Sequence, residues 1–244
     1  FMQGVEKGFL KASDIPALPT TKGTDTKRPA FTKEQFDHLV QVATQRMLET
    51  VNAKQLYERT VLLNFIVFAA NTGMRTMEMR NLDWRHIENF HMMMDKPPSD
   101  LGDIGIWAFG KGLPPQKLIP RNAAVGALER LFLATTKYFG EKPEATDPVF
   151  VNFKGERVAS FKGSLKALLT AAGLEKAGDG SNFTAYCFRH SYATWALQRD
   201  PPVDVYTLSN NMRTSVEMIQ KWYGKVRPED QKRILRGMDD KPDD

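Results

Sequence analysis

Two residues of this sequence stand where they could bind an oxyanion. Arg75 follows "NTGM", so it comes just past the glycine that should end one helix and at the start of the next. A helix N-terminus directs free N–H groups and the positive end of its dipole outward, where an arginine could help to hold a phosphate-like group. Lys111 lies in "GKG", in a tight turn between two expected strands, where the flanking glycines let the ammonium and the backbone approach a ligand closely.

A third cation and a phenol occur further along the chain. Arg189 lies in "FTAYCFRHSYATWAL" (183–197), which is patterned like a buried helix, and an arginine on such a face is unfavourable unless an anion meets it. Its neighbour His190 fits a core histidine that donates to a backbone carbonyl. Tyr223, in "MIQKWYGKV", comes at the end of an expected amphipathic helix just before Gly224, and a tyrosine placed there can act as a nucleophile.

Each of these residues also has an ordinary structural explanation. Arg75 could form a salt bridge at a helix start, Lys111 could be an exposed hairpin lysine, and Arg189 could be a partly buried ion-pair partner. Tyr223 could be an aromatic residue at the edge of the core. The sequence has no histidine or cysteine pairing suited to zinc, no phosphate loop of the Walker type and no Gly-x-Ser-x-Gly elbow. These absences disfavour metal, nucleotide and serine-hydrolase chemistry.

Composition sets the broad class of the protein. The chain has 244 residues, 41% of them hydrophobic and 26% charged, which is enough to bury a substantial core. Its net charge of +5 is compatible with a polyanionic partner without requiring one. The longest apolar run, "VLLNFIVFAA", is shorter than a membrane helix, and the single cysteine, Cys187, suits a reducing compartment. We expect a soluble cytoplasmic protein with no membrane partner.

The spacing of apolar residues predicts mostly helices. Residues 1–30 have the composition of a linker. "FTKEQF" then predicts a helix start, with Thr32 as N-cap, Gln35 completing a capping box, and Phe31 and Phe36 as a hydrophobic staple. A second helix is expected over about 55–71, a short one over 76–82, and further helices over 123–135, 164–173, 184–199, 203–212 and 215–224.

The region 90–120 differs from the rest of the chain. "FHMMM" (90–94), "IGIWAF" (104–109) and "KLIP" (117–120) look like short strands, separated by "KPPSDLGD" and "GKGLPPQ". We therefore expect a mainly α fold with a small three-stranded antiparallel β-sheet.

Four segments, taken in order, resemble the catalytic domain of the tyrosine recombinases, also called the phage integrase family. "NTGMRTMEMRNLDWRHI" resembles the first arginine box, with Arg75 and with Glu78 three residues later. "IWAFGKGLPPQKLIP" resembles the hairpin that carries the catalytic lysine, here Lys111, and "TAYCFRHSYATWAL" resembles the second box, with Arg189. "NNMRTSVEMIQKWYGKV" resembles the last box, which ends in the nucleophile, Tyr223. The resemblance covers roughly residues 30–226, and four boxes in order are far more specific than one.

Two positions depart from the family pattern. Tyr186 stands where a histidine most often occurs three residues before the second arginine, and Thr214 stands nine residues before the nucleophile, where histidine or tryptophan is usual. Both replacements can still form hydrogen bonds. His190 matches a histidine that family members also carry after the arginine, and there a supporting structural role is expected.

The resemblance implies a DNA breaking-rejoining fold and a mechanism without metal or other cofactor. Tyr223 would form a 3′-phosphotyrosyl bond with a DNA strand, while Arg75 and Arg189 stabilise charge on the phosphate oxygens. Lys111 would protonate the departing 5′-oxygen, and Glu78 would orient Arg75. The hydroxyls of two further residues would add neutral donors, and these residues are Tyr186 and Thr214.

The resemblance also implies a domain division and partners. Residues 1–30 would be the linker from an N-terminal core-binding domain outside this sequence, 31–226 the catalytic domain and 227–244 a C-terminal tail. The partners would be double-stranded DNA and further copies of the protein, as a tetramer, in the cytoplasm of a bacterium or encoded by a phage.

Three functions stay open on the sequence. The favoured one is a site-specific recombinase or integrase. A type IB topoisomerase-like enzyme would use similar chemistry to relax supercoils without exchanging partners. A catalytically weakened DNA-binding protein of the same fold would explain the residues at 186 and 214, but the retention of Arg75, Lys111, Arg189 and Tyr223 argues against it.

Overall fold

A computed structural model describes residues 7–9, 28–90, 104–110, 113–199 and 201–223.

The first long helix begins at the predicted capping box. Helix α2 covers Lys33–Leu48; the Thr32 hydroxyl accepts the backbone N–H of Gln35, and the Gln35 side chain accepts that of Thr32. The rings of Phe31 and Phe36 both pack on Phe188, at centroid distances of 5.1 and 6.3 Å. The predicted cap is therefore confirmed, and the two rings pack the start of α2 against α8 (Ala185–Gln198).

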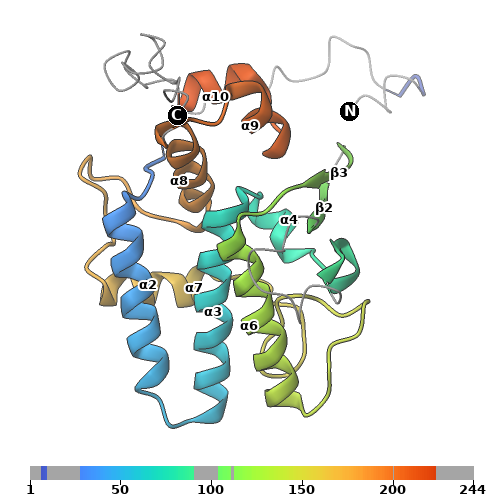
Figure 1. Ribbon diagram of the computed structural model, residues 1–244, viewed down its shortest axis with the longest axis vertical. Coiled ribbons are helices and arrows are strands. Elements are labelled where there is room, and N and C mark those ends of the chain that lie inside the picture. The colour runs from blue at the N-terminus through green and yellow to red at the C-terminus, as the bar shows by residue number, and fades with distance from the viewer. Residues whose placement is uncertain (1–6, 10–27, 91–103, 111–112, 200, 224–244) are drawn as a thin grey trace, which may run out of the picture.

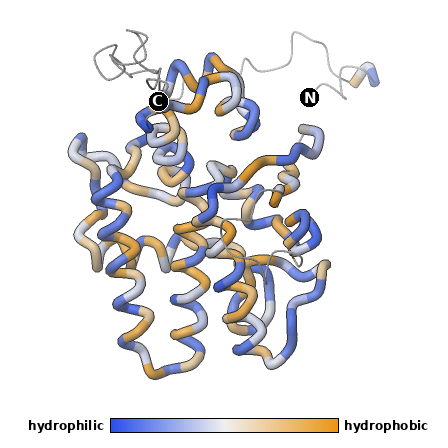
Figure 2. The backbone as a smooth tube through the Cα atoms, in the orientation of Figure 1, coloured by the Kyte–Doolittle hydropathy of each residue, from blue (hydrophilic) through white to orange (hydrophobic). Residues whose placement is uncertain are grey.

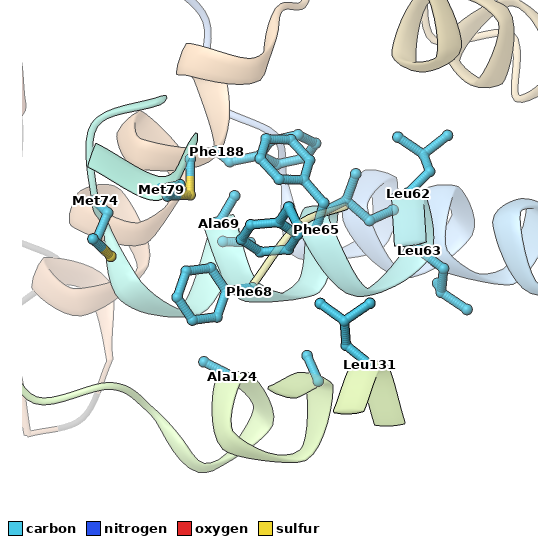
Figure 3. Close-up of a cluster of buried hydrophobic side chains, with 14 of the residues drawn as sticks. Leu62, Leu63, Phe65, Phe68, Ala69, Met74, Met79, Ala124, Leu131 and Phe188 are labelled. Carbon is cyan, nitrogen blue, oxygen red and sulfur yellow. The ribbon is translucent and has the colours of Figure 1, made fainter. Parts of the chain in front are cut away.

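Helix α3 (Ala53–Thr72) is the central helix of the molecule. It contacts α2, α6 (Asn122–Phe139) and α8 (Ala185–Gln198), and α2, α3 and α6 stand side by side in Figure 1. From Val61 onward it is apolar on nearly all sides, as expected for a helix surrounded by others. Figure 2 shows hydrophobic residues along α3 and α6 where the two helices meet. Figure 3 shows the packed cluster, which includes Phe65, Phe68, Leu131 and Phe188.

The end of α3 places the first candidate site residue. Gly73 caps the helix with φ +64°, a left-handed conformation that favours glycine, and a Cβ there would lie 2.5 Å from the Tyr192 ring. The chain then turns directly into α4 (Thr76–Arg80), with Arg75 as its N-cap. Both the end of the second helix at Gly73 and the short helix after it are confirmed.

The sheet differs from the prediction at its first and third strands. Its order is β1 (Ile87–Glu88), β2 (Gly105–Gly110) and β3 (Leu113–Leu118), antiparallel throughout. The prediction that the first strand starts at Phe90 was wrong, because β1 has ended at Glu88 and Asn89 turns the chain with φ +60°. The Phe90 ring is buried in the core against Trp84 and Phe132, and residues 91–94 lie outside the described residues.

The third strand begins four residues before the predicted one. Pro114 and Pro115 were expected in the loop, but β3 is an edge strand, and an edge strand can include prolines because one side of it needs no backbone donors. The register shifts between Ala108 and Gly110, just before Lys111.

The remaining helices form two packing units. Helix α7 (Lys162–Ala171) covers α2 in the main core. Helices α9 (Val205–Asn211) and α10 (Val216–Tyr223) lie against α8 at the far end of the molecule, away from α2 and α7 (Figure 1). They are held there by a separate apolar cluster: Tyr192, Ala193, Ala196, Leu197, Leu208, Met212 and Ile219.

The predicted fold class, mainly α with a small three-stranded antiparallel sheet, is confirmed for the described residues. Among those residues, no helix is both long and apolar enough to span a membrane.

The environment of His86 predicts a pH dependence of folding stability near neutrality. It ends a short 3-10 helix (Trp84–His86), where its Nδ1 accepts the backbone N–H of Asp83 at 3.0 Å and its ring lies 4.6 Å from that of Phe109. Burial lowers the pKa of His86 below its ordinary value, against the opposing effect of the Asp83 carboxylate. The unfolded chain therefore binds a proton at a higher pH than the folded chain, so the contribution of His86 to stability is present above pH ~6.5 and is lost as the pH falls below it.

We expect acidification from pH 7.5 to 5 to lower the melting temperature of the wild type more than that of His86→Asn. Asparagine can still accept the Asp83 N–H but carries no proton-binding group. Parallel melting curves across this range would show that His86 does not contribute.

Candidate active site

Arg75 is the N-cap of α4, and both its backbone and its side chain are hydrogen-bonded to Glu78. Its backbone N–H donates to Glu78 Oε2 at 2.9 Å, and its Nη1 donates to Glu78 Oε1 at 3.0 Å. Its Nη2 donates to the backbone carbonyl of Arg213 at 2.7 Å. The side chain stays 33% exposed, whereas that of Glu78 is buried, so the guanidinium is fixed at a surface that solvent can reach. The predicted orienting contact of Glu78 with Arg75 is present.

Arg189 is buried in α8 and joins the ends of two other helices. Its Nη1 donates to the carbonyl of Gly73, the C-cap of α3, and its Nη2 donates to that of Met212, the C-cap of α9, at 2.7 Å. Carbonyls at a helix C-terminus carry the negative end of the dipole, so they stabilise a cation there. These carbonyls explain how an arginine is kept on an apolar helix.

A second ion pair lies against Glu78. Arg213 Nη1 donates to Glu78 Oε1 at 2.9 Å, and its Nη2 donates to the carbonyl of Pro114 at 2.9 Å. Gly110 packs on this pair, because a Cβ added there would lie 3.2 Å from Glu78 Oε1 and 3.5 Å from Arg213 Nη1. Lys111 itself lies outside the described residues, but the residue before it is next to Glu78.

Tyr186 lies one turn before Arg189 on α8 and is partly exposed. Its ring is 5.2 Å from that of His190, and the guanidinium of Arg28 lies over the ring, 4.4 Å from its centre. His190, for which a supporting role was predicted, is buried.

The last two candidates lie on the α9–α10 segment. Thr214 follows Arg213 in the turn, is partly exposed, and its backbone N–H donates to the Ser209 carbonyl at 3.0 Å. Tyr223 is the last residue of α10 in the described part of the chain. Helix α10 packs on α8, which carries Arg189 and Tyr186, and on α9.

The fold thus brings Arg75, Glu78 and Arg189 together with the turn before Thr214. Arg213 and Arg28 were missed by sequence reasoning. Arg213 stands within the last box, but its contact with Glu78 depends on a turn conformation that no spacing reveals. Arg28 comes from the segment interpreted as linker.

A cationic cavity of about 930 Å³ opens beside these residues. Thr76, which follows Arg75, and Tyr186 line it, and its floor includes Phe161 and Phe183. Within the described part of the chain, Arg80 Nε in its wall is buried without a hydrogen-bond partner. Five lining residues are cations against one acid: Arg28, Arg80, Lys162, Lys166 and Lys176 against Glu175.

No group of three or more histidine, cysteine, aspartate or glutamate side chains suited to a metal occurs among residues 28–90, 104–110, 113–199 and 201–223.

Solved structures of three recombinases have the same fold. The XerH site-specific recombinase bound to palindromic difH substrate, a post-cleavage complex, matches with a TM-score of 0.61 and 18% identity, over 88% of this chain and 56% of that chain. The XerA recombinase matches with 0.55 and 16%, over 88% and 66%. The Tn1549 transposon integrase in complex with transposon right end DNA matches with 0.58 and 14%, over 88% and 67%. At these identities the likeness establishes the fold.

The chain therefore spans between about half and two thirds of the length of these recombinases. No curated protein matches the sequence.

The sequence itself matches the phage integrase family over residues 31–230, most of the chain. This match contains the segments around Arg75, Lys111, Arg189 and Tyr223 on which the resemblance was based. With the tyrosine recombinase catalytic-domain fold, it shows that this chain belongs to the phage integrase family.

Proposed function

We propose that this protein is a site-specific DNA recombinase that cleaves and rejoins strands through a 3′-phosphotyrosyl intermediate. The Tyr223 phenolic oxygen attacks the phosphorus and loses its proton, while the bond from phosphorus to the 5′-oxygen breaks and that oxygen leaves as a hydroxyl. A 5′-hydroxyl from a partner strand then attacks the phosphotyrosine and releases Tyr223. One phosphodiester is exchanged for another, so no metal or nucleotide is required.

The observation that carries this proposal is the convergence of the two arginines. Arg189 donates to the carbonyl of Met212 and Arg75 to that of Arg213, so two guanidinium groups from different helices bind adjacent peptide units. Two guanidinium groups side by side suit the non-bridging oxygens of a phosphate, where negative charge grows in the transition state.

The other candidates take the roles that remain. Lys111, on the hairpin next to Glu78, would protonate the departing 5′-oxygen. Tyr186 and Thr214 would donate neutral hydrogen bonds to the phosphate. Glu78 holds Arg75, and His190 supports Tyr186 from one turn further along α8.

Double-stranded DNA is the partner that the surroundings of the site support. The cationic cavity extends from Thr76 and Tyr186 along α7, where Lys162 and Lys166 face the same opening. Cations aligned beside a cleavage site fit the continuous phosphate backbone of a duplex. The Tn1549 integrase structure contains transposon right end DNA, which is consistent with this partner.

The remaining proposals concern the whole protein. We propose residues 1–30 as a linker to a core-binding domain, 31–226 as the catalytic domain and 227–244 as a tail. We also propose that the protein forms a tetramer on two DNA sites, in the cytoplasm of a bacterium.

One experiment tests the function. The protein is incubated in EDTA, without ATP, with a pool of nicked duplexes that carry randomised arms, and detergent-resistant adducts are collected and sequenced. Their sequence is then offered on two labelled duplexes and on a supercoiled plasmid. A recombinase joins the two duplexes, a topoisomerase-like enzyme only relaxes the plasmid, and a weakened DNA-binding protein forms no adduct. Either of the last two results would overturn the proposal.

Tyr186→Phe tests the phenol that replaces the usual histidine. It removes the hydroxyl and keeps the ring that contacts Arg28 and His190, so cleavage should slow by the ~1 to 3 kcal/mol of a lost hydrogen bond. Tyr186→His should retain activity and acquire a pH dependence near neutrality, because histidine titrates near pH ~6.5. Tyr138→Phe, on α6, is the matched control. A cleavage rate unchanged in Tyr186→Phe would make Tyr186 a packing residue only.

A further inference from the structure

We propose that Arg213 is a positioning residue for strand cleavage, which holds Glu78 and, through it, Arg75. This inference rests on the proposed function of the same site.

Arg213 closes a loop of contacts around Glu78. Its guanidinium and that of Arg75 both donate to Glu78 Oε1, at 2.9 and 3.0 Å, while Oε2 accepts the Arg75 backbone N–H. Arg75 Nη2 then returns to the carbonyl of Arg213. The side chains of Arg213 and Glu78 are each only 3% exposed. One carboxylate therefore fixes two arginines, and Arg75 cannot change its orientation without breaking contacts to both residues.

The backbone at Arg213 does not favour this residue type. Its φ is +53°, in the turn that follows the C-cap of α9, a position where glycine is the usual residue. A long side chain in the left-handed conformation is strained relative to glycine. Glycine would therefore fit this turn better than arginine does. What arginine contributes is the set of hydrogen bonds from its guanidinium to Glu78 and Pro114.

These contacts connect three segments that carry candidate catalytic residues. Arg213 reaches Glu78 at the start of α4, beside Arg75, and its Nη2 reaches the Pro114 carbonyl in β3. Gly110, the neighbour of Lys111, packs on the same pair. The turn itself leads through Thr214 into α10, which contains Tyr223. Arg213 is thus placed to fix the position of Arg75 relative to the β2–β3 hairpin and to α10, the helix that carries the proposed nucleophile.

Two variants separate this role from a purely structural one. Arg213→Gly suits the positive φ but removes the guanidinium, and Arg213→Lys keeps a charge that can meet Glu78 without also reaching Pro114. The measurement is the single-turnover rate constant of covalent adduct formation, at saturating protein, on the nicked duplex selected from the randomised pool. A loss of folded protein lowers the amplitude of this reaction, whereas a misplaced Arg75 lowers its rate constant.

We expect Arg213→Gly to lower the rate constant at least about 10-fold, with DNA affinity unchanged, because a small misplacement of a catalytic group slows the chemical step. Arg213→Lys should recover part of the rate. The double variant Arg213→Gly with Glu78→Gln should be no slower than the slower single variant, since both act on one contact. The control Arg130→Gln removes a partly buried arginine that donates to Asn64, between α6 and α3, and should leave the rate constant unchanged.

A wild-type rate constant in Arg213→Gly would overturn the inference and leave the proposed function in place. Fully additive effects in the double variant would also overturn it. If the wild type itself forms no adduct with any member of the pool, the proposed function fails, and the inference fails with it.

Discussion

Replacing Tyr223 with phenylalanine is expected to abolish the covalent protein–DNA adduct while leaving DNA binding largely intact. The substitution removes the attacking oxygen and keeps the aromatic ring at the end of α10. Phenylalanine has no side-chain oxygen with which to form the covalent bond, so the loss should be complete rather than partial. The measurement is detergent-resistant adduct on the nicked duplex, alongside a binding titration of the same variant.

Tyr206→Phe is the matched control, because Tyr206 is an exposed tyrosine on the adjacent helix α9. It should form adduct at the wild-type level. If adduct persists in Tyr223→Phe, the assignment of Tyr223 as nucleophile is wrong.

Arg75→Ala and Arg189→Ala are each expected to slow cleavage by at least ~100-fold, since each removes charged donors from the developing oxyanion. Their effects on stability should differ. Arg189 is buried and donates to the C-cap carbonyls of α3 and α9, so its removal leaves both without this donor and should lower the melting temperature. Arg75 is a third exposed, and its loss should affect folding less.

Arg130→Ala serves as the control for both, as an arginine on α6 outside the site. Circular dichroism shows whether each variant is folded at the assay temperature. Near-wild-type cleavage by a folded Arg75→Ala or Arg189→Ala variant would remove that arginine from the site.

Features that depend on neighbours in the sequence were predictable. The capping box at Thr32, the helix end at Gly73 and the start of α4 at Arg75 all depend on a few adjacent residues, and all three were found as expected. Tyr186 and Arg189 were expected one turn apart on a helix, and they are.

Features that depend on distant contacts were not predictable. Strand β1 is only two residues long and has no alternating pattern, so it exists because β2 pairs with it. The two prolines of β3 favour a loop when only the sequence is considered. They are compatible with a strand because β3 lies at the edge of the sheet. The role of Arg213 depends on a left-handed turn that brings it to Glu78, 135 residues away in sequence. The carbonyl partners of Arg189 likewise come from the ends of two other helices.

The proposed 3′-phosphotyrosyl bond is tested most directly by identifying the protein residue and the DNA end that it joins. Adduct formed by the wild type in EDTA is trapped on the selected nicked duplex, digested with protease and nuclease, and analysed by mass spectrometry. We expect a single modified peptide, with the nucleotide on Tyr223 through a 3′-phosphate and a free 5′-hydroxyl on the released strand. A nucleotide on another residue, or a bond through a 5′-phosphate, would contradict it.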